Sequence, residues 1–88
     1  MNNQVGRPAK QKTVNLSKPI KLTPKNVGSI ISTLRQDSNY TQEEWAKALG
    51  VSATTVHNWE YNVNRPTLDF LIDIFEFHGY KLIVTKES

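Results

Sequence analysis

Between residues 27 and 77, apolar positions recur at helical spacing in four groups that polar turns separate. The first group, at i, i+3, i+4 and i+7, consists of Val27, Ile30, Ile31 and Leu34. This spacing is one face of a helix. Thr23-Pro24 precedes it, and threonine caps helix N-termini while proline suits the first helical position. We therefore expect order to begin at Thr23-Pro24 and the first helix to end near Asp37.

Two short helices follow, each with its own boundary signals. Thr41 and Glu44 fit a capping box, in which each side chain bonds the backbone N–H of the other residue. This helix should stop at Gly50, which adopts a positive φ without steric cost. Ser52 can cap the next helix, and we expect that helix to run to about Tyr61.

A fourth helix, from Thr67 to about His78-Gly79, has two apolar stripes where the core of a small domain needs one. We expect the core stripe to be Leu68, Leu71, Ile72 and Phe75. The run Leu82–Val84 is rich in β-branched residues and predicts a strand, which has nothing to pair with inside this chain. A two-fold dimer would cover both the second stripe and the strand, whereas the alternative is a tail that folds back on its own helices. The residues expected at the dimer interface are Phe70, Ile74, Phe77, Leu82, Ile83 and Val84.

The segment from Gln42 to Tyr61 meets the physical requirements of a helix-turn-helix. Two helices that cross closely need a small residue at the crossing, which is Ala46, and the turn needs Gly50. The inner positions are apolar: Trp45, Leu49, Val51, Val56 and Trp59. An ordinary helical bundle predicts the apolar spacing but not the small residue and the glycine turn together.

The expected outer face of the helix after Ser52 is uncharged and rich in short hydrogen-bonding side chains. It consists of Ala53, Thr54, His57, Asn58 and Tyr61, with Thr55 at its edge. A merely solvated face usually carries lysine and glutamate, whereas asparagine and threonine can bond base edges and methyl groups can contact thymine. This composition favours a helix that lies in the major groove of DNA.

The stretch TQEEWAKALGVSATTVHNWEYN…RP resembles the helix-turn-helix of the Cro and phage-repressor family, also called the xenobiotic-response-element type. The resemblance covers Val27 to Gly79 and implies a small DNA-binding regulator, usually a dimer on a palindromic operator. It also implies individual roles. These are a phosphate contact for Gln42, base reading for Ala53, Thr54 and Asn58, backbone proximity for Thr55 and Tyr61, and either role for His57.

Two further features bear on this resemblance. The family usually has a glycine near the first or second position of Tyr61-Asn62-Val63-Asn64, and this chain has none there. The tail FHGYKLIVT resembles the ends of Hip- and Hig-type antitoxins, in which a C-terminal strand completes a dimer sheet.

The net charge of +3 divides into +6 over residues 1–25 and −3 over residues 26–88. A basic arm on a mildly acidic body indicates a polyanionic partner for the arm, although a solvated tail would have the same charge. We expect the arm to contact DNA through Arg7, Lys10 and Lys12. Gly6-Arg7-Pro8 matches the core of an AT-hook, which inserts arginine into a narrow minor groove, and general phosphate tracking is the alternative.

Composition narrows the remaining function classes. The chain has 88 residues, no cysteine and two histidines 21 positions apart, so we expect no metal site and no cofactor. No apolar run approaches the length of a membrane span, and the N-terminus lacks the apolar region of a secretory signal. The expected location is the cytoplasm, with a bacterial, plasmid or phage origin.

The sequence thus predicts a mostly α fold with four or five helices, one short C-terminal β-strand and a disordered basic arm. The expected divisions are an arm over 1–22, a helix-turn-helix domain over 23–79 and a dimerising end over 80–88. The predicted function is sequence-specific binding of double-stranded DNA by a homodimeric repressor without enzymatic activity. The alternative is an antitoxin that binds a toxin protein and represses its own operon. A small nuclease would need paired carboxylates with a histidine or lysine in a cleft, and the sequence offers no such group.

Overall fold

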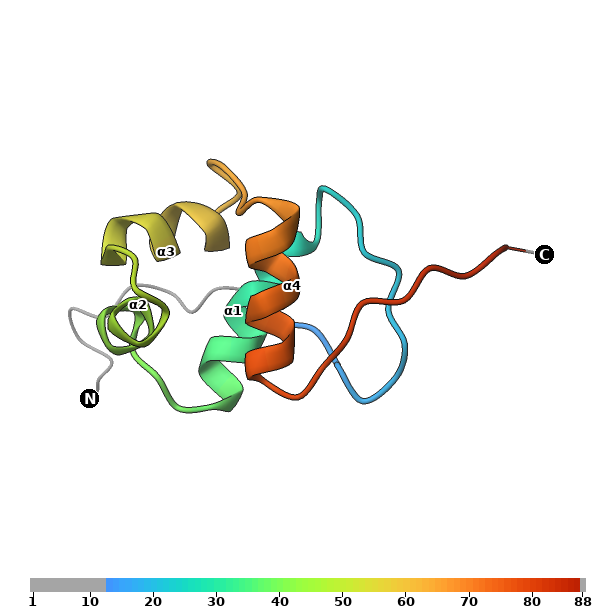
Figure 1. Cartoon of the computed structure of the whole chain (residues 1–88), viewed down its shortest axis with the longest axis horizontal. Coiled ribbons are helices and arrows are strands. Elements are labelled where there is room, and N and C mark those ends of the chain that lie inside the picture. Colours follow the sequence, from blue (N-terminus) through green and yellow to red (C-terminus); the bar gives the residue numbers. More distant parts are fainter. Residues whose placement is uncertain (1–12, 88) are drawn as a thin grey trace, which may run out of the picture.

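The computed structural model describes residues 13–87, which contain four helices in a small bundle (Figure 1). They are α1 (Val27–Asp37), α2 (Gln42–Leu49), α3 (Ala53–Glu60) and α4 (Leu68–Phe77). Helix α3 packs against both α1 and α2. Among residues 13–87, none of the helices has the length and apolar composition that a membrane span requires.

Three helices begin at the caps that the sequence predicts. The Thr41 hydroxyl accepts from the Glu44 N–H at 3.0 Å, and the Glu44 carboxylate accepts from the Thr41 N–H at 3.0 Å. Ser52 and Thr67 cap α3 and α4 in the same way, each through its hydroxyl. Gly50 ends α2 with a φ of 78°. These local bonds satisfy backbone groups that the helix ends leave free.

Helix α1 begins at Val27, three residues later than Pro24 would place it. Thr23 and Asn26 instead form a turn, in which each side chain accepts the other's backbone N–H at 3.2 and 2.8 Å. The Asn26 amide also donates to the Lys21 carbonyl at 2.8 Å. Short polar side chains of this kind compete with helix formation by bonding nearby backbone.

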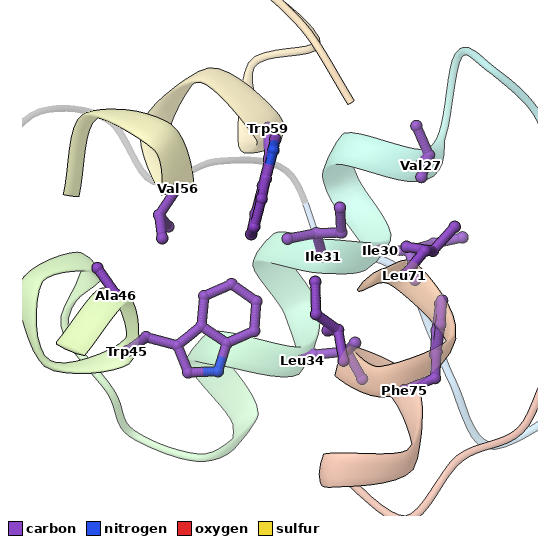
Figure 2. Close-up of a cluster of buried hydrophobic side chains, with 11 residues drawn as sticks. Val27, Ile30, Ile31, Leu34, Trp45, Ala46, Val56, Trp59, Leu71 and Phe75 are labelled. Atoms are coloured by element: carbon purple, nitrogen blue, oxygen red, sulfur yellow. The ribbon is translucent and has the colours of Figure 1, made fainter. Parts of the chain in front are cut away.

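The four helices enclose a core in which two tryptophans are central (Figure 2). The buried apolar residues are Val27, Ile30, Ile31, Leu34, Trp45, Ala46, Val56, Trp59, Leu71, Ile74 and Phe75. Leu49 and Val51 are partly buried against this cluster. The small side chain of Ala46 lies where α2 approaches α3, as predicted for a close crossing.

The predicted C-terminal strand is wrong, because residues 13–87 contain no strand. Leu82–Val84 is without regular secondary structure, and Ile83 and Val84 are 69% and 98% exposed. β-Branched residues favour extended backbone, but a strand also needs a partner for its backbone hydrogen bonds. The described part of the chain supplies none.

The structure describes residues 13–22 of the arm, which have no regular secondary structure but contact the core at two positions. Val14 and Leu16 pack against the core, and the Val14 N–H donates to the Thr33 hydroxyl at 2.9 Å. Val14 and Leu16 therefore belong to the folded unit. Residues 1–12, which include the Gly6-Arg7-Pro8 motif, lie outside the described residues.

Helix α4 presents a different stripe to the core from the one predicted. Its inward positions at i, i+3, i+4 and i+7 are Leu71, Ile74, Phe75 and His78. Ile74 is completely buried, so its assignment to a dimer interface is corrected to the core. Leu68, expected in the core, is 66% exposed. The apolar spacing alone is compatible with either stripe facing the core. The packing of the other helices determines which residues of α4 are buried.

Candidate nucleic-acid interface

Helix α3 has one face against the protein and one face turned outward. Val56, Trp59 and Glu60 are buried against α1 and α2. At 100° per residue, positions 54, 57, 58 and 61 then point away from the core. Figure 1 shows α3 at the outer edge of the bundle, with its upper side uncovered.

The outward face carries the side chains that the sequence assigns to DNA binding. Thr54, His57 and Tyr61 are exposed, whereas Ala53, Thr55 and Asn58 are half-buried. Among residues 13–87, the side chains of Thr54, His57 and Asn58 have no hydrogen-bond partner, so their donors and acceptors are available to a ligand.

Two members of this face have internal contacts. The His57 and Tyr61 rings lie one turn apart with centroids separated by 4.4 Å. This pair forms a small aromatic platform near the end of α3. The Thr55 hydroxyl lies 2.9 Å from the Ser52 hydroxyl and belongs to the N-terminal cap of the helix. Thr55 is therefore fixed by the turn rather than free for base contact.

A buried ion pair fixes α3 to α1. The Arg35 guanidinium donates from Nε to Glu60 Oε2 at 2.6 Å and from Nη2 to Glu60 Oε1 at 3.0 Å. Arg35 Nη1 donates to the Tyr40 carbonyl at 2.8 Å. The Glu60 side chain is fully buried and the Arg35 side chain is 14% exposed. Bidentate pairing of this kind sets the relative orientation of the two helices.

Gln42 joins the same network. Its amide Nε2 donates to Glu60 Oε1 at 3.1 Å, and Gln42 is half-buried at the first position of α2. One amide hydrogen is thus used inside the protein, and the other remains for the phosphate contact predicted for this residue. The network links the last turn of α1, the start of α2 and the end of α3 around one carboxylate.

Sequence reasoning did not pair Arg35 with Glu60, although a signal was present. Arg35 continues the stripe of Ile31 and Leu34 at i+4, and Glu60 continues the stripe of Val56 and Trp59 in the same way. A charged residue in an apolar stripe is buried only if a partner neutralises it. Two opposite charges at such positions on neighbouring helices therefore predict a buried pair.

A second junction involves His78, which the sequence places only at the end of a helix. Trp45 Nε1 donates to His78 Nε2 at 2.9 Å, and the Ser38 hydroxyl lies 3.0 Å from His78 Nδ1. The acceptor role of Nε2 requires the ring proton to be on Nδ1, which then donates to Ser38. Burial lowers the pKa of His78 below its usual value. The neutral ring thus connects α1, α2 and α4.

The loop after α3 turns sharply at Asn62, whose φ is 59°. Asparagine tolerates this left-handed conformation better than other non-glycine residues, and it stands where the resembled family usually has glycine. The Asn62 amide donates to the Lys25 carbonyl at 3.2 Å. Asn62 therefore adopts a positive φ, for which glycine is the usual residue, and its side chain adds a bond to the turn before α1.

The remaining predicted site residues fall into three groups, on α4, in the tail and in the arm. Phe70 is half-buried and edge-on to Trp59 at 5.3 Å, while Phe77 is 53% exposed. Leu82, Ile83 and Val84 are exposed in the tail, separate from the α3 face. Arg7, Lys10 and Lys12 lie outside the described residues. Among residues 13–87, no three acidic or histidine side chains are grouped as a metal site would require.

Comparison with known families agrees with this geometry. The profile of the helix-turn-helix family matches residues 31–84, which include all of α2, α3 and α4 and most of α1. No curated protein matches the chain.

Proposed function

This chain belongs to the helix-turn-helix family and is a DNA-binding transcriptional regulator, and we propose that it acts as a dimeric repressor that reads a palindromic operator. The protein would use the outward face of α3 to read bases, apolar side chains to form the dimer, and the arm to add contacts. Each is supported by a different set of residues.

The outward face of α3 carries the proposal. Thr54 and Asn58 offer unbonded polar groups one turn apart on a helix that a buried ion pair holds in place. Asparagine can bond adenine through both of its amide groups, and threonine can bond a base or contact a thymine methyl. Ala53 adds a methyl group and His57 adds a donor or acceptor. A rigid helix with these groups suits direct reading in the major groove.

Contacts with phosphates would fix the orientation of this helix. Gln42 has a remaining amide donor at the start of α2, and Tyr61 presents its hydroxyl at the end of α3. Thr55, which belongs to the cap, would lie close to the DNA backbone. In the arm, Arg7, Lys10 and Lys12 would add sequence-independent contacts to phosphates or to the minor groove.

The dimer is supported by apolar side chains that the core leaves uncovered. Phe77 at the end of α4 is 53% exposed, and Ile83 and Val84 follow in the tail. A second copy would remove these side chains from water, with a gain of about 25 cal/mol per Å² of apolar surface. Two-fold pairing would place two α3 helices about 34 Å apart, in successive major grooves.

A second candidate function is that of an antitoxin that also represses its own operon. The exposed apolar tail supports it, because the tail could bind a toxin protein instead of a second copy. A small toxin gene beside this one, with co-purification of the two products, would favour this candidate. A tail variant that loses the toxin but keeps operator binding would separate the two roles.

The test is selection of duplexes from a randomised pool by the purified full chain, at moderate salt. We expect enrichment of a palindrome whose half-sites are about one helical turn apart. An Asn58→Ala variant should lose preference at one position of each half-site, at a cost of about 1–3 kcal/mol. Retention of all duplexes alike would overturn the proposal, because the arm alone would then account for binding.

A further inference from the structure

A small cavity lies between α1, α4, the arm and the C-terminal tail, on the side of the bundle away from α3 (Figure 1). Its volume is about 120 Å³. Ile30 of α1 and Phe75 of α4 line it and are buried, so they form its floor, and Figure 2 shows them on neighbouring helices. The arm and the tail supply the apolar walls, which consist of Leu16, Ile20, Leu22, Tyr80 and Leu82.

The two walls are attached to the rest of the fold and to each other. The bond from Val14 to the Thr33 hydroxyl holds the start of the described arm on α1. Lys21, which lies between two wall residues of the arm, pairs with Glu87 of the tail at 3.2 Å. The walls are nevertheless incompletely covered, because Ile20, Leu22, Tyr80 and Leu82 remain 37–40% exposed. An apolar occupant would remove this surface from water.

The cavity has lysines in its lining and no acidic residue. Lys18 of the arm and Lys81 of the tail both line it, and both are exposed. A lysine at such a site covers apolar surface with its methylene stem and keeps its ammonium group in water. Among residues 13–87, neither lysine takes part in an ion pair. An apolar cavity with two uncompensated positive charges suits an amphipathic anion.

We propose that this cavity binds a small aromatic carboxylate, with the ring on Ile30 and Phe75 and the carboxylate paired with Lys18 and Lys81. The volume limits the apolar part of the ligand to about one six-membered ring, since an apolar cavity of about 150 Å³ holds one benzene molecule. Pockets for drug-sized ligands are larger, at about 300–1,000 Å³. Charge complementarity selects the carboxylate over a neutral or cationic substituent on the same ring.

A ligand at this site would act on the two ends of the chain rather than on the α3 face. The arm leads to Arg7, Lys10 and Lys12, which are proposed to contact phosphates, and the tail leads to Ile83 and Val84, which are proposed to contact a second copy. A compound bound between arm and tail favours the arrangement in which both rest on the helices. The site therefore adds control by a small anion to the proposed function.

The experiment is an NMR titration of the full chain, without DNA, with benzoate, benzyl alcohol and benzylammonium. These probes share one ring and differ in charge. We expect benzoate to bind with a dissociation constant of about 0.1–1 mM, benzyl alcohol to bind at least about fivefold more weakly and benzylammonium not to bind. Equal binding of all three probes would overturn the proposal, because the lysines would then have no part in recognition.

The lysine variants test the charged part of the site. Lys18→Gln and Lys81→Gln should each weaken benzoate about twofold to fivefold and leave benzyl alcohol unchanged, because each removes one partly solvated ion pair. Lys47→Gln makes the same charge change on α2, does not line the cavity and should keep wild-type affinity. An equal effect of all three variants would refute the site, since the loss would then reflect net charge alone.

Two further readouts locate the ligand. Benzoate should slow amide hydrogen exchange in residues 16–22 and 80–82 more than in α2 and α3, and greater protection of α2 and α3 would overturn the proposal. Benzoate affinity that falls as the protein concentration rises would show that a second copy occupies the cavity instead. None of these measurements contains DNA, so a failure here leaves the proposed function intact.

Discussion

At the scale of single residues, the position of α3 depends on close contact with α1. Gly28 lies against backbone, because an added Cβ would be 2.6 Å from the Glu60 oxygen and 2.9 Å from the Trp59 oxygen. Backbone atoms cannot rotate away as a flexible side chain can. The lack of a side chain at Gly28 is therefore what allows the two helices to approach.

A Gly28→Ala substitution tests this contact. We expect a loss of unfolding free energy of about 2 kcal/mol, since overpacking forces the backbone apart. For a domain of this size the melting temperature should fall by about 10 °C. Ser29→Ala places the same methyl group in the same turn and should change the melting temperature by at most a few degrees. Equal melting temperatures for the two variants would show that α1 and α3 are not in close contact.

Glu60 is the residue on which the buried network depends. A Glu60→Gln substitution leaves Arg35 without its charge partner, and loss of one member of a buried pair costs about 3–5 kcal/mol. The matched control is Asp73→Asn, on the exposed side of α4, which should stay within about 0.5 kcal/mol of wild type. Denaturant unfolding measures the unfolding free energy of both variants. A small effect for Glu60→Gln would mean that the pair does not fix α3.

At the scale of elements, capping signals proved more informative than apolar spacing. Ser52, Thr67 and the Thr41 capping box are confirmed as helix starts, because a cap depends only on the residues beside it. The outward face of α3 follows from its buried stripe for the same local reason. In contrast, Ile74 was assigned to the wrong stripe, because the choice between two apolar faces depends on where the other helices pack.

We expect His78, which follows α4 and bonds Trp45 of α2, to make the stability of the fold dependent on pH. The neutral ring accepts from Trp45, and burial lowers the pKa of His78 in the folded state. As pH falls through about 6.5, the unfolded chain takes up the proton before the folded chain does, so the unfolding free energy decreases. The contribution of the neutral His78 ring to the unfolding free energy is therefore complete above about pH 6.5. It is lost as the pH falls from there towards the lower pKa of His78 in the folded state.

The measurement is the unfolding free energy from pH 5 to pH 8, for wild type and His78→Gln. Glutamine retains an oxygen acceptor for Trp45 but does not titrate in this range. Between pH 6.5 and pH 5, the unfolding free energy should fall more for the wild type than for His78→Gln. Parallel profiles would show that His78 does not couple stability to pH.

At the scale of the whole molecule, assembly could not be read from one chain. The tail was predicted as a strand because Leu82–Val84 favours extended backbone, yet a strand depends on a partner that the described residues lack. Similarly, no local pattern predicts that Arg65 bonds to Pro24, because the two are 41 positions apart. Contacts between distant segments depend on the assembled fold rather than on neighbouring residues.

Phe77 tests the proposed dimer. A Phe77→Ser substitution should shift the mass in solution from dimer to monomer at micromolar concentration, because this exposed ring lies at the proposed interface. Leu68→Ser changes an even more exposed apolar residue at the other end of α4 and should leave the mass unchanged. A wild-type protein that is monomeric at this concentration would contradict the dimer directly.

The central claim is that the outward face of α3 reads DNA sequence. Its most direct measurement is the ratio of affinities for a selected duplex and an unrelated duplex, determined for wild type and Asn58→Ala at one salt concentration. The account predicts that Asn58→Ala lowers this ratio about tenfold or more while the affinity for the unrelated duplex stays the same. An unchanged ratio, or an equal loss on both duplexes, would contradict sequence reading by α3.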